Sequence, residues 1–483
     1  MNQNYELIIV GAGTAGMPCA IRAAQRGLSV LVIEKDKEVG GTLHLTAGHL
    51  SAGGTLRQKE KGIDDTAMEH WNDVQRISHN TIYEPVARKA VELAPSTIDW
   101  LASLGYEFHE KAPLLIYGHE AYNKPRTYFG ADDYFGGPIM HPGKAILKIL
   151  LPVFQQLVDE GKIHLLCNYA LQKIIIKNEK AIGVELVHQQ KLFSFFAKNI
   201  VLAAGGYASN PDFFKAHIKN ISRLVSTAKE TSTADGIKAA MEIGAVFHGA
   251  EKHISTLGGI ETEPGSGRAS FWKAWARVSN SIDRKQREIY INEDGNRFMN
   301  EYNSTVDERE RLVLQQPNQK FWIVFDETSL NDGPTVVVQW NAEQLKTEAK
   351  KEKCCWAANT IEALAKKINV PIDNLMHTVQ KYNHAVAVQK DEVFGRNYLQ
   401  HAVTQPPFYA VLTYAYSLIS FGGIKVNEKL QVVKANNKPI EGLYAAGEIL
   451  GAGATSGNAF CGGMVLTPAI SFGKWLGETI IPK

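Results

Sequence analysis

One strand–turn–helix motif near the N-terminus constrains the fold more than any other stretch. Residues 7–10 are a short apolar run, which is typical of a buried parallel strand. Gly11, Gly13 and Gly16 follow in the spacing G-x-G-x-x-G, and a helical pattern then covers roughly residues 13–27. The first glycine allows a tight turn, the second lets the backbone approach a pyrophosphate, and the third lets helix and strand pack closely. The motif predicts a dinucleotide-binding βαβ unit rather than an ordinary glycine-rich turn.

An acidic residue completes this unit. Residues 30–33 are a second apolar run, and Glu34 and Lys35 follow it, about 20 residues after the glycines. A carboxylate at this place binds ribose hydroxyls, so it favours FAD or NAD over NADP. The N-terminus of the helix would direct its N–H groups and about half a positive charge at the pyrophosphate. We expect both residues to contact the cofactor.

Composition limits the classes of partner. The chain has 483 residues, enough for two or three domains, and its 52 Lys and Arg nearly balance its 50 Asp and Glu. This balance does not indicate a nucleic-acid partner. No basic and apolar leader opens the chain, and no apolar run reaches the roughly 18 residues that span a membrane. We expect a cytoplasmic protein with no transmembrane segment, which leaves peripheral membrane contact open.

The organisation of the chain changes at about residue 250. Before this point, apolar patterns predict helices within residues 64–105, separated at Pro95, and strands over residues 163–168, 171–177, 181–188 and 199–207. After it, they predict a strand–turn–strand over residues 289–301, a strand over 321–325, and helices over 342–368 and 374–388. We therefore predict an α/β chain in which a dinucleotide-binding domain of residues 1–250 and 419–483 is interrupted by an α+β cap domain of residues 251–418. The five cysteines, odd in number and without C-x-x-C spacing, predict free thiols.

An irregular stretch, residues 106–142, is rich in glycine, proline and aromatic residues, including Tyr117, Tyr122 and Tyr128. Long irregular segments within an enzyme are often binding loops. The stretch is therefore either a substrate-binding loop or a surface loop anchored by its rings.

Two further segments carry a family resemblance. Residues 295–301 are Gly-Asn-Arg-Phe-Met-Asn-Glu, and residues 442–448 are Gly-Leu-Tyr-Ala-Ala-Gly-Glu. Together with residues 10–42 they resemble the fumarate reductase / 3-ketosteroid dehydrogenase superfamily of FAD enzymes. The resemblance implies a Rossmann-like FAD domain of the two-dinucleotide-binding-domain flavoprotein type. It also implies addition or removal of hydrogen across a C–C bond next to a carbonyl, with hydride moving to or from flavin N5.

The resemblance also implies which residues hold FAD. They belong to the glycine turn, the segment after Glu34, the strand that returns to the cofactor, and the closing segment: Gly11, Gly13, Thr14, Ala15, Gly16, Gly41, Thr42, Thr46, Ala47, Gly48, Ala170, Leu171, Ala204, Gly205, Asp235, Glu448, Val465 and Leu466. His44 falls one place away from the histidine to which succinate dehydrogenases attach their flavin. We therefore expect non-covalent FAD.

The resemblance stops at the residues that separate the branches. Fumarate reductases carry a proton-donating Arg four places after the Glu of the Asn-Glu pair, where this chain has Thr305, or Val306 with a gap. They also carry a His before one Gly-Gly pair and an Arg before the last. Residues 417–423 and 458–461 contain neither. A fumarate-like dicarboxylate would find little here to bind its charge.

The ketosteroid branch uses tyrosines, which can polarise a ketone or exchange a proton with carbon. Tyr414 and Tyr416 precede Gly422 and Gly423 here, and either would polarise the carbonyl. We expect catalytic residues among Tyr416, Tyr414, Thr305, Tyr117 and Tyr128, and no metal site. The predicted substrate is a neutral, apolar ketone or enone such as a 3-ketosteroid.

Two other functions stay open. Arginines elsewhere, such as Arg268 and Arg284, would let the same fold act on an organic acid, and His253 lies where the family often has a histidine at the cap entrance. The chain would alternatively bind FAD without turnover. No second glycine fingerprint follows a strand, so we expect a small-molecule substrate and an electron donor or acceptor that the sequence does not identify.

Overall fold

The structure is a computed structural model that describes residues 4–115, 119–131, 144–219, 221, 223–278, 285–303 and 305–481. Its larger sheet is built on the predicted βαβ unit. The strands are β1 (Asn4–Val10), β2 (Val30–Glu34), β5 (Ile163–Cys167), β6 (Ala170–Lys177), β7 (Lys180–His188), β8 (Lys191–Leu202), β16 (Gln431–Val433) and β17 (Pro439–Ala445). Their order is β16-β17-β7-β8-β1-β2-β5, with β6 beside β7 and an additional β17–β8 pairing. Strands β17, β8, β1, β2 and β5 pair in parallel, which confirms the mixed α/β fold.

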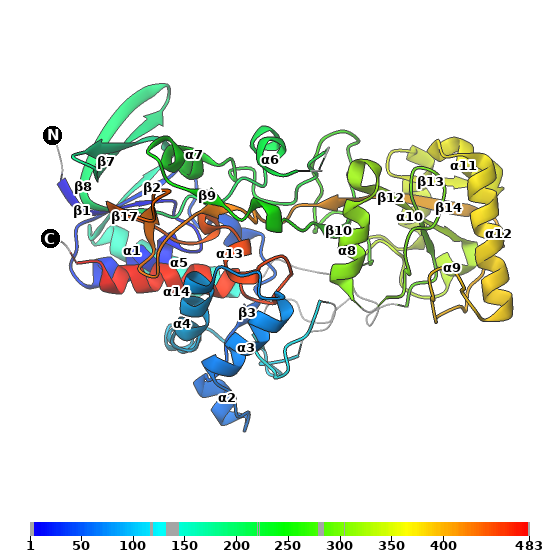
Figure 1. Cartoon of the computed structure of the whole chain (residues 1–483), viewed down its shortest axis with the longest axis horizontal. Coiled ribbons are helices and arrows are strands. Elements are labelled where there is room, and N and C mark those ends of the chain that lie inside the picture. Colours follow the sequence, from blue (N-terminus) through cyan, green and yellow to red (C-terminus); the bar gives the residue numbers. More distant parts are fainter. Residues whose placement is uncertain are drawn as a thin grey trace.

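The centre of this sheet is buried on both faces, as parallel strands require. Leu7, Ile8 and Ile9 of β1 have no exposed surface. Helix α1 (Gly16–Gln25) packs against α14 (Leu466–Thr479), so the first and last helices of the chain lie side by side near both termini (Figure 1). Gly473 permits this contact, because a Cβ there would lie 2.0 Å from the carbonyl oxygen of Ala15.

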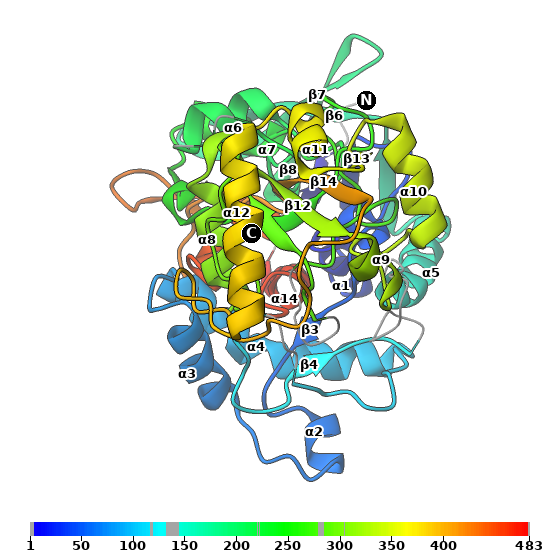
Figure 2. The ribbon, with the colours of Figure 1, turned by 90° about the vertical axis from the view of Figure 1, so that its right-hand side faces the viewer.

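The smaller sheet lies at the other end of the long axis (Figures 1 and 2). It is antiparallel, with the order β10-β14-β12-β11 and β13 beside β14. Its strands are β10 (Thr256–Gly259), β11 (Ile289–Ile291), β12 (Lys320–Asp326), β13 (Cys355–Ala358) and β14 (Phe408–Tyr416). Its helices are α8 (Val306–Leu314), α9 (Glu327–Asn331), α10 (Ala342–Lys351), α11 (Ile361–Ile368) and α12 (Ile372–Val388). All of these elements fall inside the predicted cap, whose limits at residues 251 and 418 stay a prediction.

Further helices and short strands surround the larger sheet. The helices are α2 (Leu56–Glu60), α3 (Ala67–Ile77), α4 (Glu84–Ser103), α5 (Ala145–Asp159), α6 (Pro211–His217), α7 (Asp235–Glu242) and α13 (Gly453–Ser456). The short strands are β3 (Leu50–Ser51), β4 (Thr127–Tyr128), β9 (Phe247–His248) and β15 (Gly423–Ile424). Helices α2, α3 and α4 extend to one side of the molecule, and α8 lies between its two ends (Figure 1).

Several predicted boundaries were wrong. Helix α1 begins at Gly16 rather than near residue 13. Pro95 does not separate two helices but lies inside α4, where the hydroxyls of Ser96 and Thr97 donate to the carbonyl of Leu93. The predicted helix over residues 342–368 is interrupted by β13, because residues 355–358 pair with β14.

The Gly-Asn-Arg-Phe-Met-Asn-Glu segment does not form the predicted return strand. Only Arg297 bridges back to Ile291. The wholly buried Glu301 carboxylate instead accepts two hydrogen bonds from Arg297, both of 2.7 Å, and one of 3.3 Å from Arg396. It also accepts a 3.2 Å bond from the backbone N–H of Tyr290. The buried ion pairs of Glu301 therefore hold this segment in place within the cap.

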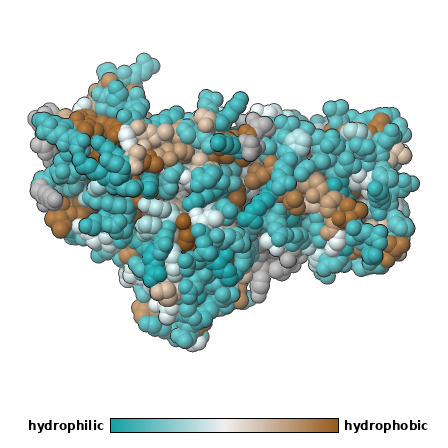
Figure 3. Space-filling model, viewed as in Figure 1, coloured by the Kyte–Doolittle hydropathy of each residue, from teal (hydrophilic) through white to brown (hydrophobic). Residues whose placement is uncertain are grey.

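The described helices include none that is both long and apolar enough to cross a membrane. The face shown in Figure 3 is mostly hydrophilic, with apolar patches scattered over it. All five cysteines are free, which confirms the prediction.

A second buried ionic network holds the segment 119–126 against α3. The guanidinium of Arg126 is 1% exposed and donates two hydrogen bonds, of 2.6 and 2.7 Å, to Asp65. It also pairs with Asp73, which accepts a 2.8 Å bond from the backbone N–H of Asn123. From α3, Arg76 pairs with Glu120 and donates to the carbonyl of Ala121 at 2.8 Å.

We predict that Arg126→Leu lowers the free energy of unfolding by about 3–5 kcal/mol, because Asp65 would stay buried without a cationic partner and Asp73 would keep only Arg76. Arg88→Leu is the matched control, since its exposed pair with Glu92 contributes about 1 kcal/mol or less. Denaturant unfolding of both variants measures the difference. Equal losses would contradict a dominant role for the Arg126 network.

Candidate active site

The three glycines of the fingerprint have different surroundings. Gly11 has φ +103°, and a Cβ there would lie 2.3 Å from the carbonyl oxygen of Ala203. A Cβ at Gly16 would lie 1.8 Å from the carbonyl oxygen of Gly11. At Gly13 the nearest described atom would be the Cα of Gly41, at 3.7 Å. The outer glycines therefore serve the fold, whereas Gly13 keeps a cradle open for a ligand.

The segment after Glu34 closes over this cradle. The backbone of Gly41 lies against Gly13, and the hydroxyls of Thr14 and Thr42 are 3.2 Å apart. Further along, the Thr46 hydroxyl accepts a bond from the N–H of Gly48, which has φ +79°. Backbone and small hydroxyls facing one another fit a pyrophosphate.

Glu34 ends β2 at the same edge. Its carboxylate accepts 2.9 Å bonds from the N–H groups of Ala12 and Asp36, and its carbonyl accepts from Tyr169, the residue before Ala170 and Leu171. These neighbours are consistent with an adenosine site, whose residue assignments stay a prediction.

Lys35 and Asp235 lie beside this edge and form an ion pair. The Lys35 ammonium donates to Asp235 at 2.7 Å and to Thr233 at 2.5 Å. Asp235 opens α7, where Gly236 packs closely on Ala204. The ion pair thus ties α7 to β2 beside Ala204 and Gly205.

The closing segment meets the first turn. A Cβ at Gly447 would lie 3.0 Å from that of Ala15, and the Glu448 carboxylate accepts a 2.9 Å bond from the N–H of Ser420. Residues from Gly447 to Ala452 face Val465 and Pro468 across a small hollow. Leu466 begins α14, whose N-terminus therefore opens at this hollow. The residues present fit a flavin, because four segments far apart in sequence converge on one cradle.

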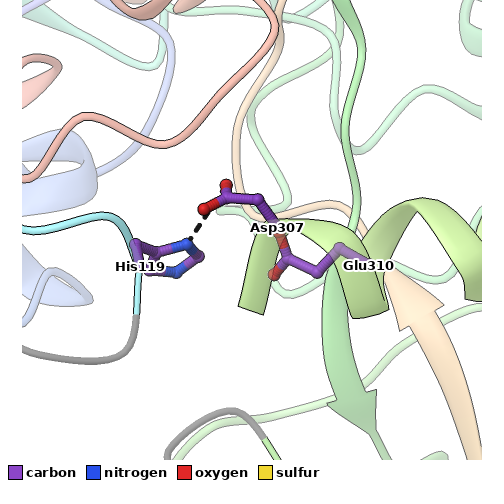
Figure 4. Close-up of side chains that lie close together, drawn as sticks. All are labelled: His119, Asp307 and Glu310. Atoms are coloured by element: carbon purple, nitrogen blue, oxygen red, sulfur yellow. Dashed lines mark hydrogen bonds and ion pairs between the residues drawn. The ribbon is translucent and has the colours of Figure 1, made fainter. Parts of the chain in front are cut away.

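A cluster of three titratable side chains lies beside these segments (Figure 4). His119 faces α8, which supplies Asp307 and Glu310, and the three side chains bring potential ligand atoms within 4.8 Å of one another. Nδ1 of His119 lies 3.4 Å from Asp307 Oδ1. The exposed fraction is 25% for the His119 side chain, 8% for Asp307 and 1% for Glu310. His119 is thus the member of the cluster that is open to its surroundings.

The ring of His119 lies against Phe460, with centroids 4.4 Å apart. The N–H of Phe460 lies 3.4 Å from Asp307, and Tyr122 donates a 2.6 Å bond to the carbonyl of Gly462. His49 follows Gly48 and lies near His119. Burial, together with the His119 charge, lowers the pKa of His49 to about 4. The cluster therefore lies between the two segments predicted to hold the flavin ring.

Burial and charge act in opposite directions within the cluster. Burial, with the nearby Asp307 charge, raises the pKa of Glu310 to about 8. Burial lowers the pKa of His119, but the Asp307 hydrogen bond and the Glu310 and Asp307 charges outweigh it and raise the pKa. Burial raises the pKa of Asp307, but the bond to His119 outweighs it and lowers the pKa. The cluster therefore combines a carboxyl group with a raised pKa, Glu310, and a hydrogen-bonded His119–Asp307 pair.

Two of the predicted tyrosines lie at the end of β14, and one of them, Tyr416, lies near Glu310. Tyr416 is 1% exposed and lies close to Thr256 and Trp275 without a well-formed hydrogen bond to either. Burial, with the nearby Glu310 charge, raises its pKa well above the usual value. The Tyr414 hydroxyl accepts a 3.3 Å bond from Arg223, which is paired with Glu261. Their catalytic roles stay predictions.

The other predicted catalytic residues are placed differently. Tyr128 is fully buried in the core of the FAD-binding part, and its hydroxyl bonds to Thr55 at 2.6 Å, a placement that favours packing over catalysis. Thr305 precedes α8, two residues before Asp307. Tyr117 and Arg284 lie outside the described residues. His253 packs between Phe214 and Phe421, and burial lowers its pKa to about 3.

The sequence analysis missed His119, Asp307 and Glu310. The available signal was the i, i+3 spacing of two acids on the helix after the Asn-Glu pair. Arg268, the predicted relocated arginine, donates to Ser209 and to the carbonyl of Ala228. Arg311 lies closer to the cluster than Arg268 does. It acts on the pKa values of Asp307 and Glu310 and donates a 3.1 Å bond to the carbonyl of Asn458.

The comparison with known families agrees with this cradle. A family model described as FAD binding domain matches residues 6–465. The chain belongs to this family. It is 26% identical to the probable fumarate reductase Ifc3 of Shewanella frigidimarina over 479 residues, 99% of this chain and 75% of that protein. It is 28% identical to the vinyl phenol reductase of Lactiplantibacillus plantarum over 474 residues, 92% of this chain and 90% of that protein.

Solved structures share this fold. The 3-ketosteroid delta1-dehydrogenase of Sterolibacterium denitrificans matches with a TM-score of 0.77 at 21% identity, over 98% of each chain, a likeness of fold alone. The protein is an FAD-dependent oxidoreductase that acts on carbon–carbon unsaturation. The family and the cofactor predicted from the sequence are confirmed at this level.

We predict that Gly13→Ala weakens FAD binding while leaving the melting temperature of the apoprotein nearly unchanged, because its Cβ fills ligand space and meets no crowded protein atom. Gly16→Ala is the contrasting variant and should lower that temperature, because its Cβ meets the Gly11 carbonyl. Flavin fluorescence titration and apoprotein melting separate the two effects. Loss of apoprotein stability in the Gly13 variant would contradict a ligand-facing role.

We predict that Glu310→Gln stabilises the protein increasingly as pH rises from about 4.5 to about 8. The folded protein keeps the Glu310 proton up to a pKa of about 8, whereas the unfolded chain loses it near 4.5, so the native residue lowers stability across this interval. Melting temperatures of both proteins between pH 4 and pH 9 check the slope. Glu308→Gln, an exposed change on the same helix, should show no such trend.

Proposed function

We propose that the protein transfers hydrogen across a carbon–carbon double bond of a neutral, largely apolar substrate. The bond would be conjugated to a carbonyl, as in an enone such as a 3-ketosteroid, or to a phenol ring. Bound FAD would supply or accept the hydride at N5. The observation that carries the proposal is the His119, Asp307 and Glu310 cluster beside the flavin segments.

The charges of this cluster disfavour a dicarboxylate. Asp307 and Glu310 place two buried carboxyl groups where the substrate would react. A pKa of about 8 keeps the Glu310 carboxyl protonated at neutral pH, so the cluster offers no unpaired positive charge to a substrate carboxylate. His119 only balances Asp307, and Arg268 is committed to Ser209 and Ala228. A hydroxyl or carbonyl group would instead find hydrogen-bond partners without added charge.

The sequence and one relative support this substrate class, whereas the similar protein Ifc3 is named a probable fumarate reductase. The three cationic or basic groups by which fumarate reductases are recognised are replaced, and Phe460 stands beside His119. A protein named vinyl phenol reductase is similar over nearly the whole chain. Tyr416 and Tyr414 stay candidates for polarising a carbonyl.

We also propose that FAD is held without a covalent bond. Nε2 of His44 lies 2.9 Å from the carbonyl oxygen of Val39, so the imidazole already has a backbone partner. The ring is further enclosed at the close approach of Gly40.

An organic acid is the second candidate, favoured by Arg311. This guanidinium lies close enough to Asp307 and Glu310 to contribute to lowering the pKa of each. A monocarboxylate that reached it would gain one cationic partner. Arg311→Gln would then abolish turnover of an acid while leaving a neutral substrate unaffected.

The experiment that tests the proposal is anaerobic. The holoprotein is reduced with dithionite and mixed separately with a 4-en-3-ketosteroid, 4-vinylphenol, fumarate and urocanate, while flavin absorbance is recorded. We expect reoxidation by a neutral compound and none by fumarate. Reoxidation by the acids alone would contradict the proposal and favour the Arg311 alternative.

A further inference from the structure

The cluster beside the flavin segments contains a buried acid with an unused atom. Oε1 of Glu310 is inaccessible and has no hydrogen-bond partner among the described residues. Such a group usually costs stability unless it serves a function. Asp307 and His119 lie within reach of it, whereas Glu308 on the same helix is exposed. Glu310 is thus placed to exchange a proton only with its neighbours.

Only His119 gives the cluster a path for exchanging protons with its surroundings. His119 is the most exposed of the three, and its ring lies against Phe460 near Gly462. Because Nδ1 bonds to Asp307, Nε2 is the nitrogen left to exchange a proton elsewhere. Asp307 would fix the orientation of the ring, as a carboxylate does for many catalytic histidines.

We propose that His119 donates and accepts the substrate proton through Nε2, with Asp307 orienting its ring and Glu310 recharging it; this inference rests on the proposed function. His119 is then the catalytic residue, and Asp307 and Glu310 are positioning residues.

The step balances for reduction. The π bond of the substrate breaks, one carbon gains a hydride from reduced FAD, and the other gains the Nε2 proton of His119. The substrate is reduced by two electrons and FAD is oxidised by two. The neutral imidazole then takes the Glu310 proton, directly or through a water molecule within the 4.8 Å that the cluster spans. During product exchange His119, the partly exposed member, takes a proton from solvent and passes it to Glu310, and a second solvent proton recharges His119. Dehydrogenation reverses each step.

The groups around His119 favour the protonated form of its ring. Asp307, Glu310 and Arg309 from α8 act on its pKa, which rises despite burial. Glu310 is itself influenced by Asp307, Arg309 and Arg311. A hydrogen-bonded His119–Asp307 pair and a carboxyl group with a raised pKa thus lie within one cluster, as a proton donor and its reservoir require.

The first test follows the anaerobic half-reaction. Reduced His119→Gln, Asp307→Asn and Glu310→Gln proteins are mixed with whichever compound of the panel above reoxidises the native flavin. Proton delivery contributes about 100- to 10,000-fold, so we expect a loss in this range for His119→Gln. Reoxidation by oxygen, which needs no substrate proton, should stay close to native. His377→Gln and Glu308→Gln, both exposed, are the matched controls.

The pH profile separates orientation from structure. Reduction needs the imidazolium, so the native rate should fall as pH rises through the raised pKa of His119. Asp307→Asn removes a group that raises this pKa, so the fall should move to lower pH. An unchanged profile in this variant would show that Asp307 only supports the fold.

A second readout needs no turnover. Diethyl pyrocarbonate modifies neutral imidazole, and mass spectrometry of the holoprotein gives the extent at His119 and at His377 across pH. We expect modification of His119 to begin at higher pH in the native protein than in Asp307→Asn, with the exposed His377 as the internal standard for reagent activity. Because no substrate is present, this result stands even if the neutral-substrate proposal fails.

Three outcomes would overturn the inference. His119→Gln would keep a near-native rate, or Tyr416→Phe alone would give the large loss. Alternatively, a divalent cation would be required and a chelator would abolish the rate, which would identify the cluster as a metal site. FAD content and melting temperature of each variant show whether a loss reflects misfolding.

Discussion

The buried ion pairs of Arg126 with Asp65 and Asp73 are the constraint on which the site depends. They hold an otherwise irregular segment against α3, so that Tyr122 reaches the Gly462 carbonyl and His119 reaches Asp307 on α8. An ion pair so completely buried contributes little net stability but is costly to break, which makes it a device for position rather than for stability. The cluster thus joins His119 from this segment to two residues of α8, Asp307 and Glu310.

Local patterns predicted the FAD-binding part well because its determinants are local. Strand, glycines, helix and acid lie within one short unit, and each glycine has a steric reason that the structure displays: Gly11 against Ala203 and Gly16 against Gly11. Strand β13 was missed for the opposite reason. Its residues lie among lysines and helical patterns, and only pairing with β14, more than fifty residues later, makes them a strand. Similarly, local grounds place a helix boundary at Pro95, whereas α4 continues through it with Val91, Ala94 and Ile98 buried.

The cluster was beyond sequence reasoning for a related reason. His119 and Asp307 are separated by 188 positions, and a lone histidine in an aromatic loop has no partner that periodicity can identify. Two acids three residues apart on a helix usually mark a solvated face. Burial reverses that interpretation here, because Glu310 is 1% exposed whereas Glu308 is exposed. Long-range packing therefore decides which acid on α8 has a shifted pKa. In this surrounding the pKa of Glu310 is raised and that of Asp307 is lowered.

The motif that carried the family resemblance does not describe the chemistry. Glu301 of the Gly-Asn-Arg-Phe-Met-Asn-Glu segment is wholly buried and bound to Arg297 and Arg396, so the segment holds the cap together and would do so for any substrate. In the proposed function, the substrate would instead meet the side chains that follow this segment on α8 and lie against Phe460. Asp307 and Glu310 make no hydrogen bond to Arg297 or Arg396, so a change at either acid would leave the Glu301 ion pairs in place. The residues that hold the cap together and those proposed to contact the substrate therefore belong to separate networks.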